Sequence, residues 1–280
     1  MNVLIVGATG KTGRFVVEAV LARGHGVRAA SRSPAPTRDG VTPVVFDWED
    51  KSTWAAVAGD AQAMYLVGPG KLADPGHRVS DLLTATPGVR RVVVLSDMSA
   101  GAIDDGTSPK LDVERAVRRS GKEWTVLRSN WFHQNFTEIS VFTAAMDARD
   151  EIVAPAGGAR VSFIDAADTA EVAAVTLTTD GHDGQTYVLT GPQALTFGQV
   201  AAELTNAGRS VHHVDPPSKD MAVSLAGMDL PAPLIPVIGP LFQQIRDGVN
   251  SPVTDTVEKI TGRPARSLAS FLAATVQENA

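Results

Sequence analysis

The chain has 280 residues, 44% of them hydrophobic, and a formal net charge of −6 at pH 7. No segment approaches the roughly 20 consecutive apolar residues that cross a bilayer, and the N-terminus lacks the basic segment of a signal peptide. The absence of cysteine excludes disulfides, thiolate metal sites and thiol nucleophiles. The histidines show no spacing typical of metal ligands, and no basic cluster indicates nucleic acid as the main partner. A soluble cytoplasmic protein without a metal is the expectation.

The N-terminal segment, where an apolar strand runs into three glycines, is the most informative one. Residues 3–13 read VLIVGATGKTG, with Gly7, Gly10 and Gly13 at three-residue spacing. A continuous apolar run predicts a strand buried on both faces, as in a parallel sheet. The glycines let the backbone approach a diphosphate, and the helix expected over Phe15–Leu21 points its N-terminus at that anion. We therefore predict a dinucleotide-binding loop; a structural turn that binds nothing is the alternative.

Strand and helix patterns alternate through the first half of the chain. Further strands are expected at Gly26–Ala30, Val41–Phe46, Ala61–Val67, Arg91–Leu95 and Trp124–Arg128, with helices at Lys51–Ala58, Asp74–Ala85 and Pro109–Ser120. Ser108 as N-cap and Pro109 at the first helical position mark the start of the last of these helices. Such alternation predicts parallel pairing through right-handed crossovers, and hence an α/β fold with a doubly wound parallel Rossmann sheet.

The second half of the chain has a different pattern, which predicts a smaller and mostly helical C-terminal lobe. Helices are expected at Phe132–Ala148, Ala166–Thr178 and Phe197–Asn206, and short strands at Val161–Ile164 and Thr186–Leu189. The proline-rich segment Asp215–Pro240 is expected to pack helices over the mouth of the sheet. We predict a nucleotide-binding domain over residues 1–150 and a substrate lobe over residues 151–280; one compact unit is the alternative.

Ligands of doubly wound sheets bind at the carboxyl ends of the strands, so the residues that follow each strand are the candidates for a site. The second strand is followed by Ser31, Arg32 and Ser33, with no acidic residue to hold ribose hydroxyls. A guanidinium with hydroxyls beside it suits a 2′-phosphate, which favours NADP(H) over NAD(H). A solvated surface arginine is the alternative.

The third and fourth strands are followed by residues that suit the adenosine end of such a cofactor. Asp47 is placed to accept a hydrogen bond from an adenine amino group, and Trp48 offers a flat apolar wall. Equally, Asp47 begins a turn and Trp48 belongs to the core. Gly68, Pro69 and Gly70 keep side chains away from whatever lies over the sheet edge, which suits a ribose, although they also make an ordinary loop; Val67, Gly68 and Pro69 are candidates for cofactor binding.

The fifth strand is followed by Ser96, Asp97 and Met98, and Lys110 lies on the helix that returns from this loop. A hydroxyl and an ammonium so placed indicate a catalytic site in which Ser96 contacts substrate or nicotinamide and Lys110 binds the nicotinamide ribose. Asp97 and Met98 are candidates for the substrate pocket. The acidic pair Asp104-Asp105 favours a cationic substrate if it lies at a pocket mouth. A solvated lysine and a solvated turn are the alternatives.

The sixth strand is followed by a dense aromatic segment, SNWFHQNF, over residues 129–136. We predict that Asn130, Trp131 and Phe132 line an apolar substrate pocket with polar contacts. The alternative is that the aromatic rings form core beneath the second lobe. His133 is a candidate proton donor, although a histidine packed in the interior is the more ordinary environment.

Over nearly its whole length the chain resembles the NmrA-like branch of the atypical short-chain dehydrogenase/reductases. The resemblance rests on the opening GATGKTGR, the strand RVVVLS, and the segments WTVLRSNWFHQNF, FIDAADTAEVAAVTL and TGRPARSLASF. Within that branch, FDWEDKSTW and AMYLVGP are similar to the reductases related to agroclavine dehydrogenase, which belong to secondary metabolism.

The resemblance implies an NADPH-dependent reductase with Arg32 on the 2′-phosphate. It also implies that the residues of the first loop hold the pyrophosphate: Gly7, Thr9, Gly10, Lys11, Thr12 and Gly13. Lys110 matches the lysine of the family's Tyr-x-x-x-Lys pair, but Gly106 stands in the place of the tyrosine and Ser129 in that of the proline of the L-R-P motif. Because the usual phenol is missing, the expected acceptor of hydride is already activated: an iminium, an enone or a quinone.

Two other functions stay open at this point. Some NmrA-like proteins are NADP-binding redox sensors that act on a protein partner, and the fold also supports non-redox cyclases and epimerases. For the reductase, the expected partner is a small-molecule substrate, and the protein is expected to be a monomer or a homodimer.

Overall fold

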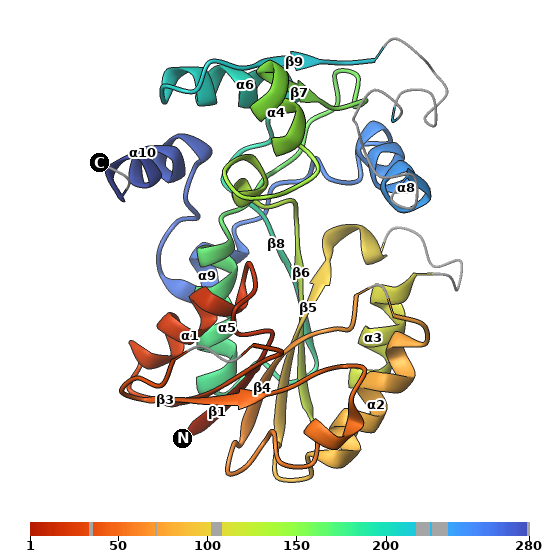
Figure 1. The fold of residues 1–280 in the computed structure, drawn as a ribbon, viewed down its shortest axis with the longest axis vertical. Coiled ribbons are helices and arrows are strands. Elements are labelled where there is room, and N and C mark those ends of the chain that lie inside the picture. Colours follow the sequence, from red (N-terminus) through yellow and green to blue (C-terminus); the bar gives the residue numbers. More distant parts are fainter. Residues whose placement is uncertain (34–35, 71, 102–107, 217–224, 226–234, 279–280) are drawn as a thin grey trace. The chain divides into compact units, whose positions relative to one another are not determined.

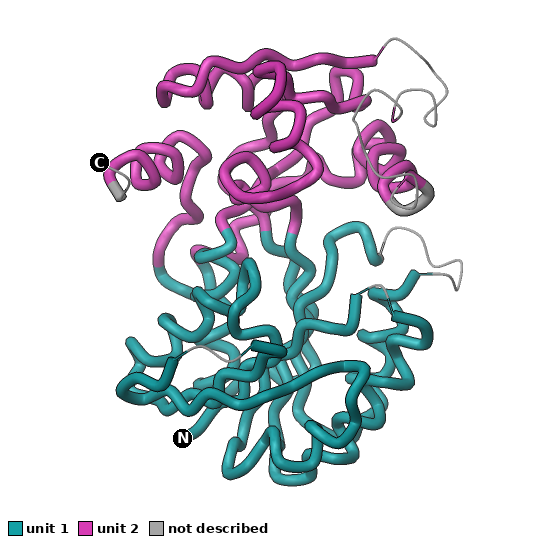
Figure 2. The backbone as a smooth tube through the Cα atoms, viewed as in Figure 1, with its two compact units in different colours: residues 1–129, 166–189, 259–262 teal, residues 130–165, 190–258, 263–280 magenta. Residues whose placement is uncertain are grey.

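The computed structural model describes residues 1–33, 36–70, 72–101, 108–216, 225 and 235–278 (Figure 1). The chain forms two units, each compact in itself (Figure 2). Unit 1 comprises residues 1–129, 166–189 and 259–262, and unit 2 comprises residues 130–165, 190–258 and 263–280. The units are therefore interleaved along the chain, and the single domain boundary expected at residue 150 stays a prediction.

Unit 1 is built on a seven-stranded sheet with the strand order β3-β2-β1-β4-β5-β6-β8, and every pair in it is parallel. The strands are β1 Asn2–Val6, β2 Gly26–Ser31, β3 Val41–Val45, β4 Ala63–Val67, β5 Arg91–Asp97, β6 Glu123–Ser129 and β8 Gln185–Leu189. The strand order reverses between β1 and β4, which is the switch point where ligands of doubly wound sheets bind. This topology confirms the predicted α/β Rossmann fold.

Helices cover both faces of this sheet (Figure 1). Helices α1 (Gly13–Leu21) and α5 (Ala166–Thr178) pack together on one face, while α2 (Pro75–Ala85) and α3 (Pro109–Arg118) pack together on the other. Side chains on both faces of the central strands are consequently buried, and Val3, Leu4 and Ile5 are each 0% exposed. Burial on both sides explains why β1 is a continuous apolar run rather than an alternating one.

Helix α3 begins where the sequence predicts. The Ser108 side chain accepts the N–H of Leu111, and Pro109 occupies the first turn. The helix expected over Lys51–Ala58 is wrong, because only the 3-10 turn η1 (Lys51–Thr53) forms there. The indole of Trp54 lies in the core and donates to the carbonyl of Asp47 at 2.7 Å, so packing around this ring replaces helical periodicity.

Unit 2 contains a two-stranded parallel sheet and several helices around an aromatic core. Its elements are η3 His133–Phe136, α4 Thr143–Arg149, β7 Glu151–Val153, α6 Phe197–Asn206, β9 His212–Val214, α8 Ile235–Arg246 and α10 Leu268–Glu278. Helix α9, Thr256–Thr261, has residues in both units, and the 3-10 turn η2, Met98–Gly101, belongs to unit 1. Phe136, Phe142, Phe163 and Phe197 form the centre of the core, with ring centroids 5.2–6.4 Å apart. Such aromatic contacts stabilise the unit beyond their burial alone.

Two elements expected in unit 2 differ from the prediction. The helix expected over Phe132–Ala148 is interrupted, because the Ser140 hydroxyl donates to the Asn135 carbonyl at 2.5 Å and so competes with helical hydrogen bonds. The strand expected over Val161–Ile164 forms only isolated bridges. By contrast, α5, which belongs to unit 1, and α6, which belongs to unit 2, have the predicted bounds, and a Thr196–Gln199 capping box starts α6.

Most of the segment Asp215–Pro240 lies outside the described residues, as do Asp104, Asp105 and Gly106. In the part of the chain that is described, no helix combines the length and the apolar character required to cross a lipid bilayer.

Candidate functional site

The loop that follows β1 is shaped by its glycines. Gly7 has a φ of +82°, which favours glycine over other residues. At Gly13, a Cβ atom would lie 2.1 Å from the main-chain oxygen of Gly7, and at Gly10 it would lie 3.1 Å from the same oxygen. The first turn of α1 is therefore packed directly on the loop, and only glycine permits this approach.

Main-chain hydrogen bonds hold the loop in place but leave several donors open. The N–H groups of Gly7 and Ala8 both donate to the carbonyl of Ala30 at the end of β2, at 3.0 and 3.1 Å. Among the described residues, the N–H groups of Thr9, Thr12 and Gly13 have no hydrogen-bond partner.

These open donors suit the loop to binding an anion. Thr12, the N-cap of α1, makes no side-chain capping bond that would occupy the first turn. Unpaired N–H groups at a helix N-terminus, together with the helix dipole, attract a phosphate. The residues present therefore fit a diphosphate held by main-chain groups.

The side chain of Thr12 points into unit 1 rather than toward a ligand. The Tyr65 hydroxyl on β4 donates to Thr12 Oγ1 at 3.0 Å, and both side chains are buried. Burial raises the pKa of Tyr65, so this phenol stays protonated. Thr12 can contribute its N–H to a pyrophosphate, while its hydroxyl anchors the loop to β4. The neighbouring Lys11 is half-buried.

The turn after β2 presents a cation. Arg32 is exposed, and within the described parts of the chain its guanidinium makes no hydrogen bond or ion pair. Ser31 is buried and donates its hydroxyl to the carbonyl of Ser33 at 2.8 Å, which closes the turn. An uncommitted guanidinium next to a hydroxyl oxygen fits a phosphate monoester.

After β3, the polar and aromatic groups are largely engaged with one another. Asp47 Oδ1 accepts the N–H of Glu49 at 2.9 Å, as a turn-forming aspartate does. The Trp48 ring lies edge-on to those of Phe46 and Trp54, with centroids 5.0 and 5.7 Å away. These contacts favour the turn and core interpretation, and a role of Asp47 and Trp48 at an adenine ring stays a prediction.

A small cavity lies where the ends of β4 and β5 meet the start of α3. Its lining residues are Gly68, Gly70, Pro75, Leu95, Pro109, Lys110 and Val113. The side chain of Val67 lies at the switch point, 3.4 Å from where a Cβ on Gly7 would stand, and Pro69 is buried. Lys110 is half-buried, and its ammonium has no partner among the described residues. The loop glycines and a free ammonium thus lie at one edge of the sheet of unit 1.

Ser96 is engaged in a network that the sequence did not reveal. Its side chain is buried, and its hydroxyl donates to Oε1 of Glu114 at 2.6 Å. Glu114 is 0% exposed and also pairs with Arg118 and Arg128. The proton of Ser96 is therefore committed to a buried carboxylate, and direct contact with a substrate stays a prediction. A glutamate among Leu111, Val113 and Val117 is the signal that would have indicated this network.

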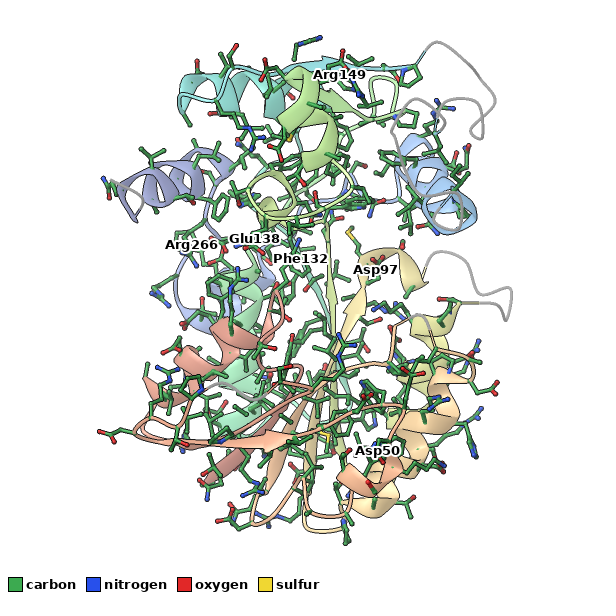
Figure 3. The ribbon with its side chains drawn as sticks, in the orientation of Figure 1. Asp50, Asp97, Phe132, Glu138, Arg149 and Arg266 are labelled. Carbon is green, nitrogen blue, oxygen red and sulfur yellow. The ribbon has the colours of Figure 1, made fainter. Side chains whose placement is uncertain are left out.

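Asp97 and Met98 follow Ser96 at the end of β5, where Figure 3 labels Asp97. The Asp97 carboxylate accepts both the N–H and the hydroxyl of Ser99 and so starts η2. Met98 is half-buried. A place for both residues in a substrate pocket stays a prediction.

The polar group of Asn130, in unit 2, is fully used within that unit. Its amide donates to Ser162 Oγ and to the Asn250 carbonyl, both at 2.8 Å. Its oxygen accepts from the Trp131 N–H and from Asn250 Nδ2, both at 2.9 Å. These buried bonds give Asn130 a structural role, and a substrate contact from it stays a prediction.

The aromatic rings of the same segment belong largely to the core of unit 2. Trp131 is half-buried, with its ring centroid 5.9 Å from those of Phe142 and Phe242. Phe136 is 0% exposed. Phe132, labelled in Figure 3, is half-buried and pairs with Ile164 in an isolated parallel bridge. The alternative interpretation of this segment, as core, therefore describes most of it.

His133 is a packed histidine rather than an evident proton donor. Its side chain is 1% exposed, and burial lowers its pKa to about 4 despite the nearby Asp165 carboxylate. Its Nδ1 has no hydrogen-bond partner among the described residues. An imidazole with this pKa is neutral near pH 7 and is therefore only a weak acid, which favours the interior role.

Neither tyrosine replaces the missing phenol. Tyr65 lies beneath the glycine loop, bonded to Thr12. Tyr187, on β8, has its hydroxyl 2.9 Å from Nδ1 of His182. Both phenols are engaged, and the place that the family's tyrosine would take falls at Gly106, outside the described residues.

Comparison with known proteins agrees with this geometry. Residues 7–180 match the model of a family described as NAD(P)H-binding. The chain belongs to this family. The glycine loop lies within the matched range. An NAD(P)H cofactor therefore agrees with the dinucleotide-binding loop expected there.

The similarity extends over the whole chain. This chain is 33% identical to an NAD(P)H azoreductase of Xenophilus azovorans, and the match covers 96% of each chain. It is 30% identical to agroclavine dehydrogenase of Claviceps fusiformis, covering 97% of this chain and 94% of the relative, which confirms the resemblance inferred from motifs. The structure of an NADPH-dependent quinone oxidoreductase from Escherichia coli, complexed with NADPH, superposes with a TM-score of 0.81 at 23% identity, covering 98% of this chain and 99% of that one. At this identity, the last comparison shows the fold.

Proposed function

We propose that this NAD(P)H-dependent oxidoreductase transfers a hydride from NADPH to an already activated small molecule: an iminium, an enone or a quinone. The observation that carries the proposal is the set of uncommitted donors at one edge of the sheet of unit 1. The open N–H groups of the loop, the guanidinium of Arg32 and the ammonium of Lys110 belong to this set. We also propose that the protein acts in the cytoplasm as a monomer or homodimer.

Each group has a distinct part in the proposal. The loop amides hold the pyrophosphate, Arg32 binds the 2′-phosphate, and Lys110 binds the ribose at the nicotinamide end. When bound, NADPH supplies the hydride, and the protein orients it and excludes water. An iminium needs only that hydride, whereas a quinone or an enone also takes up a proton. Activated acceptors need little proton donation during transfer, which is consistent with two engaged tyrosines.

The names of the relatives support the same class of reaction. They include an NAD(P)H azoreductase, an agroclavine dehydrogenase and a quinone oxidoreductase. Oxidoreductase chemistry is common to these three names, and none of them is the name of a redox sensor or an epimerase.

The test is consumption of NADPH with a panel of acceptors: menadione, an azo dye, a cyclic iminium and a cyclic enone. A simple dialkyl ketone serves as the matched control, since it requires a proton donor at the moment of transfer. We expect turnover with at least one activated acceptor and none with the ketone. Cofactor binding without any turnover would support a sensor instead, and product formation without loss of NADPH would support a cyclase or an epimerase.

Preference for the 2′-phosphate has its own test. Arg32→Ala should weaken NADPH binding about tenfold to a hundredfold, because a charge-assisted hydrogen bond is lost, and should leave NADH binding unchanged. Calorimetric titration with both nucleotides measures this. Arg90→Ala is the matched control, since Arg90 is another exposed arginine and precedes β5, at the opposite edge of the sheet. Equal losses for NADPH and NADH would remove the argument for a phosphate at Arg32.

A further inference from the structure

A fully buried carboxylate lies one helical turn beyond Lys110. Glu114 is on α3, four residues after the lysine, so both side chains lie on the same side of the helix. Its side chain is 0% exposed. A buried charge is costly unless it is paired and hydrogen-bonded, so its partners must account for its presence.

The partners of Glu114 come from two neighbouring strands. Oε1 accepts from Ser96 Oγ at 2.6 Å and from Arg128 Nε at 3.0 Å, and Oε2 accepts from Arg128 Nη2 at 2.8 Å. Arg118, on the same helix, adds the fourth hydrogen bond of the carboxylate, which joins Arg118 Nη2 to Oε2 at 3.0 Å. Ser96 and Arg128 are register partners on β5 and β6, so they project from the same face of the sheet. One carboxylate thus ties α3 to the carboxyl ends of two strands.

Lys110 lies one helical turn before this attachment. The lysine lines the cavity at the ends of β4 and β5 together with Gly68 and Leu95. Its ammonium has no partner among the described residues, so no contact of its own fixes it there. The Ser108 cap fixes the start of α3 within the helix itself, and one turn later Glu114 attaches the helix to Ser96 and Arg128 of the sheet.

We propose that Glu114 is a positioning residue for Lys110: it holds the start of α3 so that the ammonium stands where the nicotinamide ribose of the cofactor binds. The inference rests on the proposed function, in which Lys110 contacts the bound cofactor. A purely stabilising ion pair is the alternative. Buried ion pairs are weak sources of stability compared with apolar packing, so a network that joins three elements at the edge of the site is better explained by geometry.

A double-mutant cycle separates positioning from stability. The variants are Glu114→Gln, Lys110→Ala and the double mutant, each assayed for kcat with NADPH and menadione. We expect Lys110→Ala to lower kcat about thirtyfold and Glu114→Gln about tenfold, while the double mutant falls no further than Lys110→Ala alone. Multiplication of the two losses would mean that Glu114 acts independently of the lysine, and would overturn the proposal.

A second readout does not depend on turnover. Lys110 is acylated with an amine-reactive reagent in the presence and absence of NADP⁺, and its modification is followed by mass spectrometry. In the protein without substitutions, NADP⁺ should slow acylation of Lys110 several-fold. In Glu114→Gln this protection should be lost. Equal protection in both proteins, or binding of NADP⁺ without protection of Lys110, overturns the positioning role. Failure of NADP⁺ to bind at all refutes the proposed function instead, so the two failures are distinguishable.

Two further variants complete the test. Val117→Ala is the matched control, since Val117 is 0% exposed on the same helix and makes no hydrogen bond to the network through its side chain. It should lower Tm but retain kcat and the protection of Lys110; losses like those of Glu114→Gln would show that packing alone matters. Ser96→Ala removes a single bond to Glu114 and keeps the test open if Glu114→Gln does not fold. We expect a smaller loss of kcat of about threefold, again absent when Lys110 is already alanine.

Discussion

Two segments that follow strands, one in each unit, use similar polar residues in opposite ways. In unit 1, the loop after β1 keeps the N–H groups of Thr9, Thr12 and Gly13 without partners in the described structure. In unit 2, the segment that begins at Asn130 uses its polar groups internally. Asn130 makes bonds to Ser162 and Asn250 through its amide, and its oxygen is also occupied.

This difference separates a ligand site from a structural network. Polar residues at a strand end are candidates for a binding site. They can bind a ligand only if their hydrogen-bond donors and acceptors are not already used within the protein. A buried donor or acceptor that is already satisfied stabilises the fold, and taking it away is costly. An unpartnered donor at the surface costs little and is free to bind. Four substitutions test this contrast.

The largest effect is expected for Gly13→Ala. A Cβ atom there would stand 2.1 Å from the Gly7 oxygen, so the loop must shift and its open N–H groups move away from the anion. We expect NADPH affinity to fall by at least about a hundredfold, measured by calorimetry. Gly198→Ala is the control, because in the first turn of α6 the added atom meets only Thr196 Oγ1, at 3.8 Å. If Gly13→Ala binds NADPH normally, the loop is not the diphosphate site.

Asn130→Ala should do the reverse and affect stability rather than binding. The substitution removes four hydrogen bonds and leaves Nδ2 of Asn250 and the N–H of Trp131 without their partner, whereas Ser162 keeps its bonds to Asn250 and Pro252. The free energy of unfolding should fall by about 4 kcal/mol, as measured by urea denaturation, while the Kd of NADPH at a temperature where the variant is folded stays the same. A weakened Kd with unchanged stability would restore Asn130 to the candidate ligand-binding residues.

His133 should make the stability of the protein depend on pH. Its pKa falls from 6.5 to about 4 on folding, because burial disfavours the imidazolium. Between these values the unfolded chain binds the proton and the folded chain does not, so stability is full above about pH 6.5 and decreases as the pH falls. The loss is about 1.4 kcal/mol per pH unit, or about 3 kcal/mol in all.

The measurement compares unfolding free energies of the unmodified protein and His133→Gln at pH 7.5 and pH 5, at equal ionic strength. The variant lacks the titrating group, so its stability should fall less between the two pH values. The Asp165 carboxylate and the Arg266 guanidinium, which also act on the imidazole, are present in both proteins. Parallel curves would show that His133 titrates in the folded protein as it does in the unfolded chain, and would return it to the candidate proton donors.

The smallest effect is expected for Tyr65→Phe. The substitution removes the hydroxyl that donates to Thr12 Oγ1 and keeps the ring in the core. We expect a loss of about 1 kcal/mol in unfolding free energy and a decrease in affinity of up to about fivefold, equal for NADPH and NADH, since the loop that holds their common diphosphate is loosened. Tyr187→Phe, at a phenol bonded to His182 and outside the loop, is the control. A loss confined to one nucleotide would contradict this explanation.

The sheet of unit 1 could be predicted from the sequence because its signals are local. The central strands β1, β4 and β5 contain continuous apolar runs, and each of the expected strands of this sheet lies within two residues of the observed one. The helix expected after β3 failed because Trp54 is held by a contact with Asp47 that no periodicity records. The three-residue strands β7 and β9 are too short to leave an alternating pattern.

The state of the candidate site residues was less predictable, for a physical reason. The hydroxyl of Ser96 is taken by Glu114, 18 residues away, and the amide of Asn130 is taken by Asn250, 120 residues away. A side chain at a strand end has the same appearance in the sequence whether or not such a distant partner exists. The roles proposed for the glycine loop and Arg32 depend on the absence of such partners, and the described structure is compatible with them, but their contact with a cofactor stays a prediction.

The carbonyl of Ala30 links the glycine loop to the end of β2. It accepts the N–H groups of both Gly7 and Ala8, and it lies two residues before Arg32. Since Val6 and Ala30 are register partners, the separation between the loop amides and the arginine is set by two adjacent strands and not by flexible chain. In the proposed function, the main chain therefore fixes the distance between the diphosphate loop and the Cα atom of the arginine that binds the 2′-phosphate.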